Sequence, residues 1–309
     1  MIVTAAQISP VVLDRDATIQ KITASIAEAA REGSQLIAFG ETFLPGYPFW
    51  VDQIPNPTFE NSHQKAVHAR YLTESVDLAA GHLNPICEAA KINKIFVVIG
   101  IAERVGHTLF ASCVTINDEG TILNVHRKLC ATFEERLCWG NGDAQGLRVF
   151  QCHDFHLGSL NCWENWMPLA RTALYEQGEN LHVAIWPGSD KLTRDITRFV
   201  AKESRSFVLS AGGILNWSDV PADLPGIEPK SGWIQNGGSC LAGPDGEWIG
   251  EPITEREGLF HWDIEIERVL EERQNFDPVG HYARPDLLKL EIDHKRIHSL
   301  RTTNDSQNV

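Results

Sequence analysis

Residues 157–168 read Leu157-Gly-Ser-Leu-Asn-Cys162-Trp-Glu-Asn-Trp-Met-Pro168 and join a strand-like run to the start of a helix. The apolar run ends at Cys162, and a short connection leads to Pro168, a residue that suits the first turn of a helix. A thiol at such a junction is exposed at the edge of the sheet and lies close to helix N–H groups, which lower the pKa of a cysteine. Although most single cysteines are small core residues, we expect Cys162 to be a reactive nucleophile.

The segments on both sides of this junction alternate between strands and helices. After the junction, residues 181–186 and 207–211 are strand-like, and residues 193–205 have helical spacing. Before the junction, the chain opens with a β-α-β-α-β pattern over the ranges 2–8, 19–30, 35–39, 75–91 and 95–102. The alternation predicts an α/β fold in which helices cover a mixed sheet, or two sheets.

Short polar segments between strand-like runs indicate hairpins. Asn117-Asp-Glu-Gly120 and Pro244-Asp-Gly246 have the composition of hairpin turns. The segment Cys152-His-Asp-Phe-His156 has metal-ligand residue types, but its alternating spacing between two strands favours a hairpin over a metal site. We therefore predict no metal site.

The charge balance limits the classes of partner. The 309 residues carry 41 Asp plus Glu and 27 Lys plus Arg, a net charge of −14. A chain of this charge repels phosphate backbones and anionic lipid surfaces, so neither nucleic acid nor a membrane is an expected partner. The longest apolar runs, such as residues 95–102, are far below the roughly 20 residues that span a bilayer.

The cysteines and the N-terminus indicate a cytoplasmic protein. Seven cysteines are scattered without CxxC pairs in a chain too large to need disulfides for stability. Residues 1–7 enter strand-like sequence directly, without the basic and apolar regions of a signal peptide. We expect a soluble protein in a reducing cytoplasm.

Two further chemically active residues follow predicted strands. Glu41 comes after the strand 36–39 and Gly40, and Lys128 comes after the strand 122–126 and Arg127. Because the carboxyl ends of strands in an α/β sheet converge on one crevice, residues far apart in sequence can meet there. Glu41, Lys128 and Cys162 would then supply a base, a cation and a thiol.

In this order the three residues resemble the catalytic set of the nitrilase superfamily of carbon-nitrogen hydrolases. Glu41 in Gly40-Glu-Thr-Phe-Leu-Pro45 matches the family's glutamate motif, Lys128 in His126-Arg-Lys-Leu129 the lysine motif, and Cys162 in Asn161-Cys-Trp-Glu-Asn165 the cysteine motif. The resemblance runs from Gln7 to about Asp286. Trp163 after the cysteine, Trp139-Gly-Asn-Gly-Asp143 and Gly280-His-Tyr-Ala-Arg-Pro-Asp286 resemble the nitrilase branch, whereas amidase-like branches usually carry another residue after the cysteine.

The resemblance also implies a second glutamate. The family places it directly before an arginine, which selects Glu135 in Thr132-Phe-Glu-Glu-Arg136 and leaves Glu134 as a solvated neighbour. Ala131 stands where the family usually has proline. The catalytic residues implied are therefore Glu41, Lys128, Cys162 and Glu135.

The implied reaction converts an organic nitrile to the carboxylic acid and ammonia. Glu41 would take the proton of Cys162, whose sulfur attacks the nitrile carbon to form a covalent thioimidate and later a thioester. Lys128 would stabilise the negative charge that develops, and Glu135 would hold Lys128 or the attacking water. The division of proton transfer between the two glutamates stays open.

Aromatic residues near the motifs could contact the substrate. Tyr47, Trp163 and Trp186 are the candidates for a substrate wall, although each could equally be a core residue, as could Trp166. For His281, the resemblance offers no role in bond cleavage, and we expect it to pack in a loop near the pocket.

As a nitrilase relative, the chain would form a four-layer α-β-β-α sandwich without a cofactor. We expect residues 1–285 to form a single domain and residues 286–309 a C-terminal tail on the surface or at an oligomer interface. The family resemblance implies a homo-oligomer, a dimer or larger, which in several nitrilases extends to a spiral.

Other activities stay open. A cyanide-degrading or nitrile-hydrating relative would prefer cyanide or release the amide, and an aliphatic amidase of the same superfamily would ignore nitriles. A non-catalytic interaction module would not need to keep Glu41, Lys128 and Cys162 together.

Overall fold

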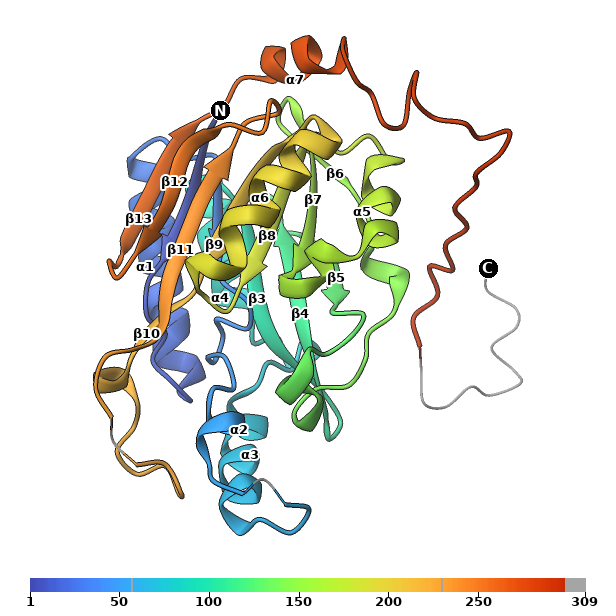
Figure 1. Cartoon of the computed structure of the whole chain (residues 1–309). Coiled ribbons are helices and arrows are strands. Elements are labelled where there is room, and N and C mark those ends of the chain that lie inside the picture. Colours follow the sequence, from blue (N-terminus) through green and yellow to red (C-terminus); the bar gives the residue numbers. More distant parts are fainter. Residues whose placement is uncertain (57, 229, 298–309) are drawn as a thin grey trace.

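The structure is a computed structural model that describes residues 1–56, 58–228 and 230–297, with two β-sheets lying face to face (Figure 1). The first sheet has the order β13-β1-β2-β3-β4-β5, with the bounds Gly258–Asp263, Ile2–Gln7, Leu36–Phe39, Phe96–Val105, Thr108–Ile116 and Ile122–Arg127. The second has the order β10-β11-β9-β8-β7-β6, with the bounds Ile214–Asn216, Trp233–Ala242, Phe207–Gly212, Leu181–Trp186, Phe155–Asn161 and Phe150–Cys152; β12 (Trp248–Thr254) also pairs with β11.

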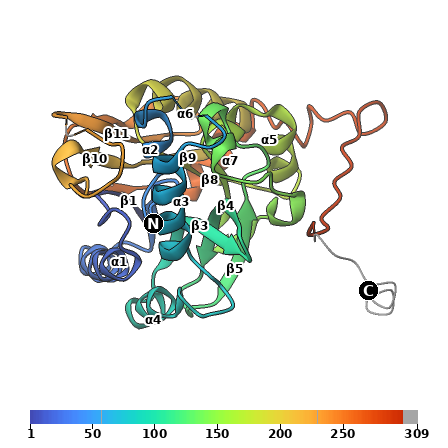
Figure 2. The same cartoon turned by 90° about the horizontal axis from the view of Figure 1, so that it is seen from below.

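Helices cover the outer face of each sheet (Figure 2). On the first sheet lie α1 (Arg15–Arg31) and α4 (Asn84–Asn93), and on the second lie α5 (Pro168–Tyr175) and α6 (Asp190–Ser204). The remaining helices are α2 (Trp50–Gln53), α3 (Ser62–Glu74) and α7 (Ile266–Arg273), with short 3₁₀ turns η1 (Phe133–Leu137), η2 (Ala144–Gly146), η3 (Cys162–Trp166) and η4 (Trp217–Asp219). The layers are therefore α-β-β-α, which confirms the predicted fold class.

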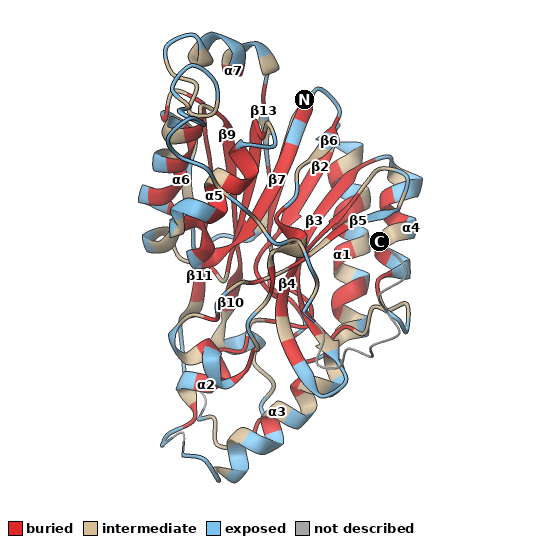
Figure 3. Ribbon diagram, turned by 90° about the vertical axis from the view of Figure 1, so that its right-hand side faces the viewer, coloured by how far each residue is buried: buried red, intermediate tan, exposed pale blue. Residues whose placement is uncertain are grey.

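The central strands are buried on both faces, because one face packs on helices and the other on the second sheet (Figure 3). In β3, Val97 and Ile99 join the core beneath α1 and α4, whereas Phe96 and Val98 join the core between the sheets. Side chains alternate across a strand, so a continuous apolar run is what such a position requires.

Helices α1 and α6 both begin at a side-chain cap, and α1 buries apolar residues at helical spacing. Ile22 and Ile26 of α1 are buried at helical spacing, and the Asp14 side chain accepts the N–H of Ala17 to cap the helix. The N-terminus of α6 is capped by Ser189, whose hydroxyl accepts the N–H of Lys191.

The predicted helix over residues 75–91 is partly wrong. Residues 75–83 are not helical, and α4 begins at Asn84, with Pro85 in its first turn. Helix α3 was not predicted, because only Val67 and Tyr71 of its residues are buried and its sequence has almost no apolar period. Helices α2 and α3 lie beyond the ends of the strands, at the bottom of Figure 1.

The predicted hairpins are confirmed. Strands β4 and β5 pair antiparallel across residues 117–121, and β11 pairs with β12 across residues 243–247. The Cys152–His156 segment joins β6 to β7, with Cys152 opposite Phe155.

The end of the described chain runs along the surface. Residues 286–297 are largely exposed, and the Arg296 guanidinium donates to Asp143 at 3.1 Å. The His294 ring bonds the Ala144 carbonyl at 3.0 Å. The rest of the expected tail, residues 298–309, lies outside the described residues. None of the helices in the described ranges combines the length and apolarity needed to cross a membrane.

Candidate active site

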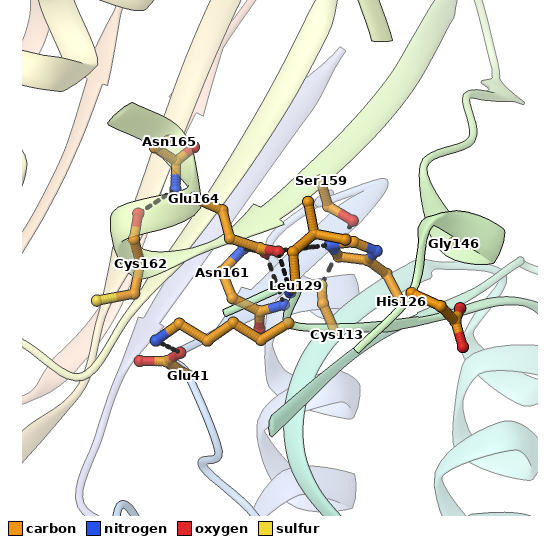
Figure 4. Close-up of polar contacts among 12 residues, drawn as sticks. Glu41, Cys113, His126, Leu129, Gly146, Ser159, Asn161, Cys162, Glu164 and Asn165 are labelled. Atoms are coloured by element: carbon orange, nitrogen blue, oxygen red, sulfur yellow. Dashed lines mark hydrogen bonds and ion pairs between the residues drawn. The ribbon is translucent and has the colours of Figure 1, made fainter. Parts of the chain in front are cut away.

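The site forms where three strands of the two sheets end. Glu41 lies two residues beyond β2, Lys128 directly follows β5, and Cys162 directly follows β7. Strands β2 and β5 belong to the first sheet and β7 to the second, so the site lies between the sheets. Figure 4 shows the Cys162 sulfur and the Glu41 carboxylate pointing toward one another from opposite sheets.

Glu41 is held where the backbones of the two sheets touch. Its N–H donates to the Trp186 carbonyl at 3.0 Å. A Cβ on the preceding Gly40 would lie 2.8 Å from the Gly213 nitrogen and 2.9 Å from that same Trp186 oxygen, so only glycine allows this approach. The close contact fixes the direction in which Glu41 leaves the strand.

Lys128 lies between two carboxylates. Its Nζ donates to Glu41 Oε1 at 2.8 Å and to Glu135 Oε2 at 2.7 Å, and the side chain is 2% exposed. The second glutamate is fixed in turn, because Glu135 Oε2 also accepts the Thr132 N–H and Oε1 accepts the Tyr47 hydroxyl at 2.9 Å. The ammonium is therefore positioned by two anchored acceptors.

Cys162 has a backbone conformation that L-residues rarely adopt. Its φ is +49°, and it begins the turn η3, which leads through Met167 to Pro168 and helix α5. The sulfur, one Glu41 oxygen and one Glu135 oxygen lie within 4.8 Å of one another. Left-handed conformations of this kind are frequent at functional sites, where they direct a side chain out of the sheet.

The prediction that the pKa of the Cys162 thiol is lowered was wrong in sign. Burial raises the pKa of Cys162 well above its ordinary value, and this outweighs the lowering by Lys128 and by the Trp163 backbone N–H. The sequence revealed the nearby N–H groups but not that the side chain is only 1% exposed. The free thiol therefore keeps its proton until a base removes it.

The glutamate beside the thiol is matched to that task. Burial, opposed by Lys128 and assisted by Glu135, raises the pKa of Glu41 to about 8. A base of this pKa accepts a thiol proton more readily than an ordinary carboxylate does. Burial lowers the pKa of Lys128, but Cys162 and the two glutamates raise this pKa by more than burial lowers it, so the amine stays charged.

Three residues of the site have side chains of the types that bind metal ions. Glu41, Glu135 and Cys162 each offer a ligand-type atom within this small space. The Lys128 ammonium already donates to both carboxylates, so the chain itself supplies the cation between them.

A cavity of about 700 Å³ reaches Cys162 and Glu135 of this cluster. Tyr47 and Trp163, two of the candidates for a substrate wall, are among its lining residues. Trp186 does not: its indole is fully buried in the core and donates to Ser210 Oγ at 3.2 Å, although its carbonyl anchors Glu41. The prediction that Trp186 contacts substrate is thus contradicted by the structure.

Other cavity walls come from segments that the sequence did not single out. They include Phe49, Lys191, Leu192, Trp217, Lys230 and Trp233. No motif marks these residues, since they lie in loops and at the starts of η4, β11 and α6 and meet only after folding. Glu134 also lines the cavity, as the half-buried neighbour of Glu135. His281 is exposed beside Tyr282 and is not among the lining residues.

Comparison with known proteins identifies the family of the chain. The sequence model of the carbon-nitrogen hydrolase family matches residues 2–274. A protein described as Nitrilase 2, from an unknown prokaryotic organism, is 36% identical over 293 residues, covering 93% of this chain and 91% of that protein. An aliphatic nitrilase of Rhodococcus rhodochrous is 33% identical over 315 residues, covering 97% of this chain and 84% of that protein.

The fold has solved relatives as well. A carbon-nitrogen hydrolase from Helicobacter pylori superposes with a TM-score of 0.69 at 19% identity, covering 93% of this chain and 96% of that chain. At this identity the likeness concerns the fold, whereas the sequence matches above concern the family. This chain therefore belongs to the carbon-nitrogen hydrolase family and is a hydrolase of carbon–nitrogen bonds.

Proposed function

We propose that the protein is a nitrilase that converts an organic nitrile to the carboxylic acid and ammonia, with Cys162 as its nucleophile. The observation that carries the proposal is the buried ammonium of Lys128, which is hydrogen-bonded to Glu41 and to Glu135, while Glu135 and the nearby Cys162 line the cavity. The relatives described as nitrilases, which align over more than nine-tenths of this chain, support the same activity.

The first step joins the nitrile carbon to sulfur. Glu41 takes the thiol proton, the Cys162 sulfur attacks the carbon, and the triple bond becomes the double bond of a thioimidate. Negative charge develops on the nitrile nitrogen, which then receives the proton from Glu41. Lys128 stabilises this charge, because a fixed ammonium in a site of low water content acts strongly on it.

The second step releases ammonia. A water molecule gives a proton to a glutamate and adds to the thioimidate carbon, and the glutamate passes this proton to the nitrogen. The tetrahedral intermediate then expels ammonia, which takes the hydroxyl proton, and leaves a thioester. Another water hydrolyses the thioester, which releases the acid and returns the proton to sulfur. Glu135 keeps Lys128 in place through both steps. If sulfur leaves the tetrahedral intermediate first, the product is the amide.

Substitution of the nucleophile tests the mechanism. We expect Cys162→Ala to abolish ammonia release from every nitrile and to leave the melting temperature within a few degrees of wild type, since Ala fits the same backbone. The matched control is Cys113→Ala, a buried cysteine between the sheets, which should keep turnover. Ammonia release by Cys162→Ala at the wild-type rate would end the proposal.

A substrate panel separates the alternatives. Arylacetonitriles, benzonitriles, aliphatic nitriles, cyanide and the matching amides should be compared, with acid and amide both quantified. Acid as the main product from an organic nitrile supports the nitrilase. Fast amide turnover with inert nitriles would instead assign an aliphatic amidase, and a preference for cyanide, or amide as the main product from a nitrile, would assign the cyanide-degrading or nitrile-hydrating relative.

The cavity walls and the outer surface support two further parts of the proposal. Tyr47 and Trp163 would contact the substrate, because both line the cavity. A homo-oligomer is supported by Trp166 and Leu169, large apolar side chains that are exposed on η3 and α5. Light scattering after size exclusion measures the mass, and a monomer at micromolar concentration would contradict this part.

The compartment and the domain limits complete the proposal. All seven cysteines are free thiols, five of them buried, as suits a reducing cytoplasm. Residues 1–285 would form one domain, with residues 286–309 as a tail on the surface or at an interface. A variant ending at residue 285 that still folds would support this division, and a variant that fails to fold would contradict it.

A further inference from the structure

A third buried glutamate, Glu164, lies behind Glu41, Glu135 and Cys162 and bonds to both sheets. Its Oε1 accepts the N–H of Leu129 at 2.6 Å, and its Oε2 accepts the N–H of Asn161 at 2.9 Å (Figure 4). Leu129 directly follows Lys128, and Asn161 directly precedes Cys162. One carboxylate therefore links the backbones that carry the ammonium and the nucleophile.

No hydrogen-bonded ladder of the described strands makes this link. Strand β5, which ends before Lys128, is the edge of the first sheet, and β7 lies in the second. The apolar contacts between packed sheets are non-directional, so they resist separation better than small sliding movements. A directional bond to each backbone restricts sliding where the positions of nitrogen and sulfur matter.

His126 fixes the carboxylate. Its Nε2 lies 3.0 Å and 3.2 Å from the two Glu164 oxygens, and both side chains are almost fully buried. Its Nδ1 has no hydrogen-bond partner within the described chain, so the proton of a neutral ring belongs on Nε2, where it can donate. The imidazole supplies a hydrogen bond that a buried carboxylate needs.

The ring itself has little room to turn. Gly146 packs against it, and a Cβ there would lie within 2.6 Å of the His126 Cβ and 2.9 Å of its Nδ1. The Gly146 carbonyl accepts the Asn124 amide at 2.9 Å, which secures the packing segment to β5. The donor is thus held in place before any substrate arrives.

We propose that Glu164, oriented by His126, is a positioning residue that holds the Lys128 segment and the Cys162 turn in register across the two sheets. It touches neither the substrate nor the reacting atoms, and it acts through the two backbones that it binds. Glu164 stays ionised in this role. Burial raises its pKa, but His126 and the backbone N–H groups of Leu129 and Asn161 lower the pKa by more than burial raises it, so the pKa lies below its ordinary value.

The inference depends on the proposed function only for its turnover readout. A second readout needs no substrate: the rate at which iodoacetamide alkylates Cys162. Lys128 lowers the pKa of this thiol, so displacing the ammonium relative to the sulfur should slow alkylation. Cys87, half-buried on α4, is the internal reference in the same digest, quantified by mass spectrometry.

The decisive variants replace the donor. His126→Leu removes the N–H, whereas His126→Gln keeps an amide N–H near the position of Nε2. We expect His126→Leu to lower kcat about 100-fold, as a misalignment near 1 Å can do, with KM within about threefold because the cavity walls are untouched. Alkylation of Cys162 should slow at least tenfold and that of Cys87 should not change. His126→Gln should recover most of both rates.

Glu103→Gln is the matched control. Glu103 is a buried carboxylate of the same sheet that binds Arg127, the residue between His126 and Lys128, yet it has no bond to the Cys162 turn. We expect it to lower the melting temperature while kcat stays within about threefold of wild type. Melting temperatures and circular dichroism show that each variant is folded.

Several results would overturn the inference. One is a kcat and an alkylation rate near wild type in folded His126→Leu. Others are a loss in His126→Gln equal to that in His126→Leu, or a loss in Glu103→Gln as large as either. If wild type turned over no nitrile, the proposed function would fail, while the alkylation series would still decide on the positioning role. Should His126→Leu not fold, His126→Gln compared with Glu164→Gln decides, since Glu164→Gln must show the larger loss.

Discussion

The pH dependence of turnover follows from the position of Glu41. Burial beside Glu135 raises the pKa of this carboxyl from an ordinary 4.5 to about 8. Its proposed role requires the ionised form, so activity should be gained as pH rises through the pKa and lost as pH falls. About 1% of Glu41 would be ionised at pH 6, about 9% at pH 7 and about half at pH 8.

The expected profile of kcat/KM therefore rises nearly tenfold from pH 6 to pH 7 and levels off above about pH 9. The assay measures initial rates of ammonia release from a nitrile without an ionisable group, at constant ionic strength. Because kcat/KM reports the free enzyme, it is the quantity to compare with this pKa.

The matched control for this profile is Glu134→Gln, which removes a cavity carboxylate that has no bond to Lys128. We expect this variant to leave the midpoint unchanged. A profile that varies by less than about twofold between pH 6 and pH 8 would refute the reasoning, because the base would then have an ordinary pKa.

Two further predictions separate positioning from substrate contact at the cavity wall. Tyr47→Phe removes the 2.9 Å hydrogen bond to Glu135, and because a bond to a charged acceptor contributes roughly 1.5–3 kcal/mol, kcat should fall about 10- to 100-fold. A rise in KM with unchanged kcat would show that the hydroxyl serves substrate binding instead. Trp163→Ala should raise KM for aromatic nitriles several-fold and change the melting temperature little, since Trp163 is 46% exposed. Unchanged KM across the substrate panel would exclude this wall contact.

Local patterns in the sequence were enough to predict helices covering one or two sheets, and the family resemblance added the four layers and Glu135. Continuous apolar runs such as residues 95–102 identify strands buried on both faces, and chemically active residues just beyond strand ends identify the crevice. Glu41, Lys128, Glu135 and Cys162 do lie together, as the resemblance implied.

The features that escaped prediction depend on depth or on contacts between distant segments. Burial decides the sign of the Cys162 pKa shift, and no local pattern reveals how far a turn lies below the surface. The burial of Trp186 escaped prediction for a similar reason, because its position at a strand end did not reveal on which face of the sheet its indole lies. Helix α3 has too few apolar residues to show a period, since it packs on neighbours through only a narrow stripe.

The left-handed backbone at Cys162 has a consequence for how the protein could change over time. A residue with a Cβ in this conformation costs roughly 1–2 kcal/mol of folding free energy, and glycine avoids most of that cost. A copy of the chain that is no longer selected for activity would thus gain stability if glycine replaced Cys162. Cysteine at this position lowers the stability of the fold, and only its role in the reaction compensates for that loss.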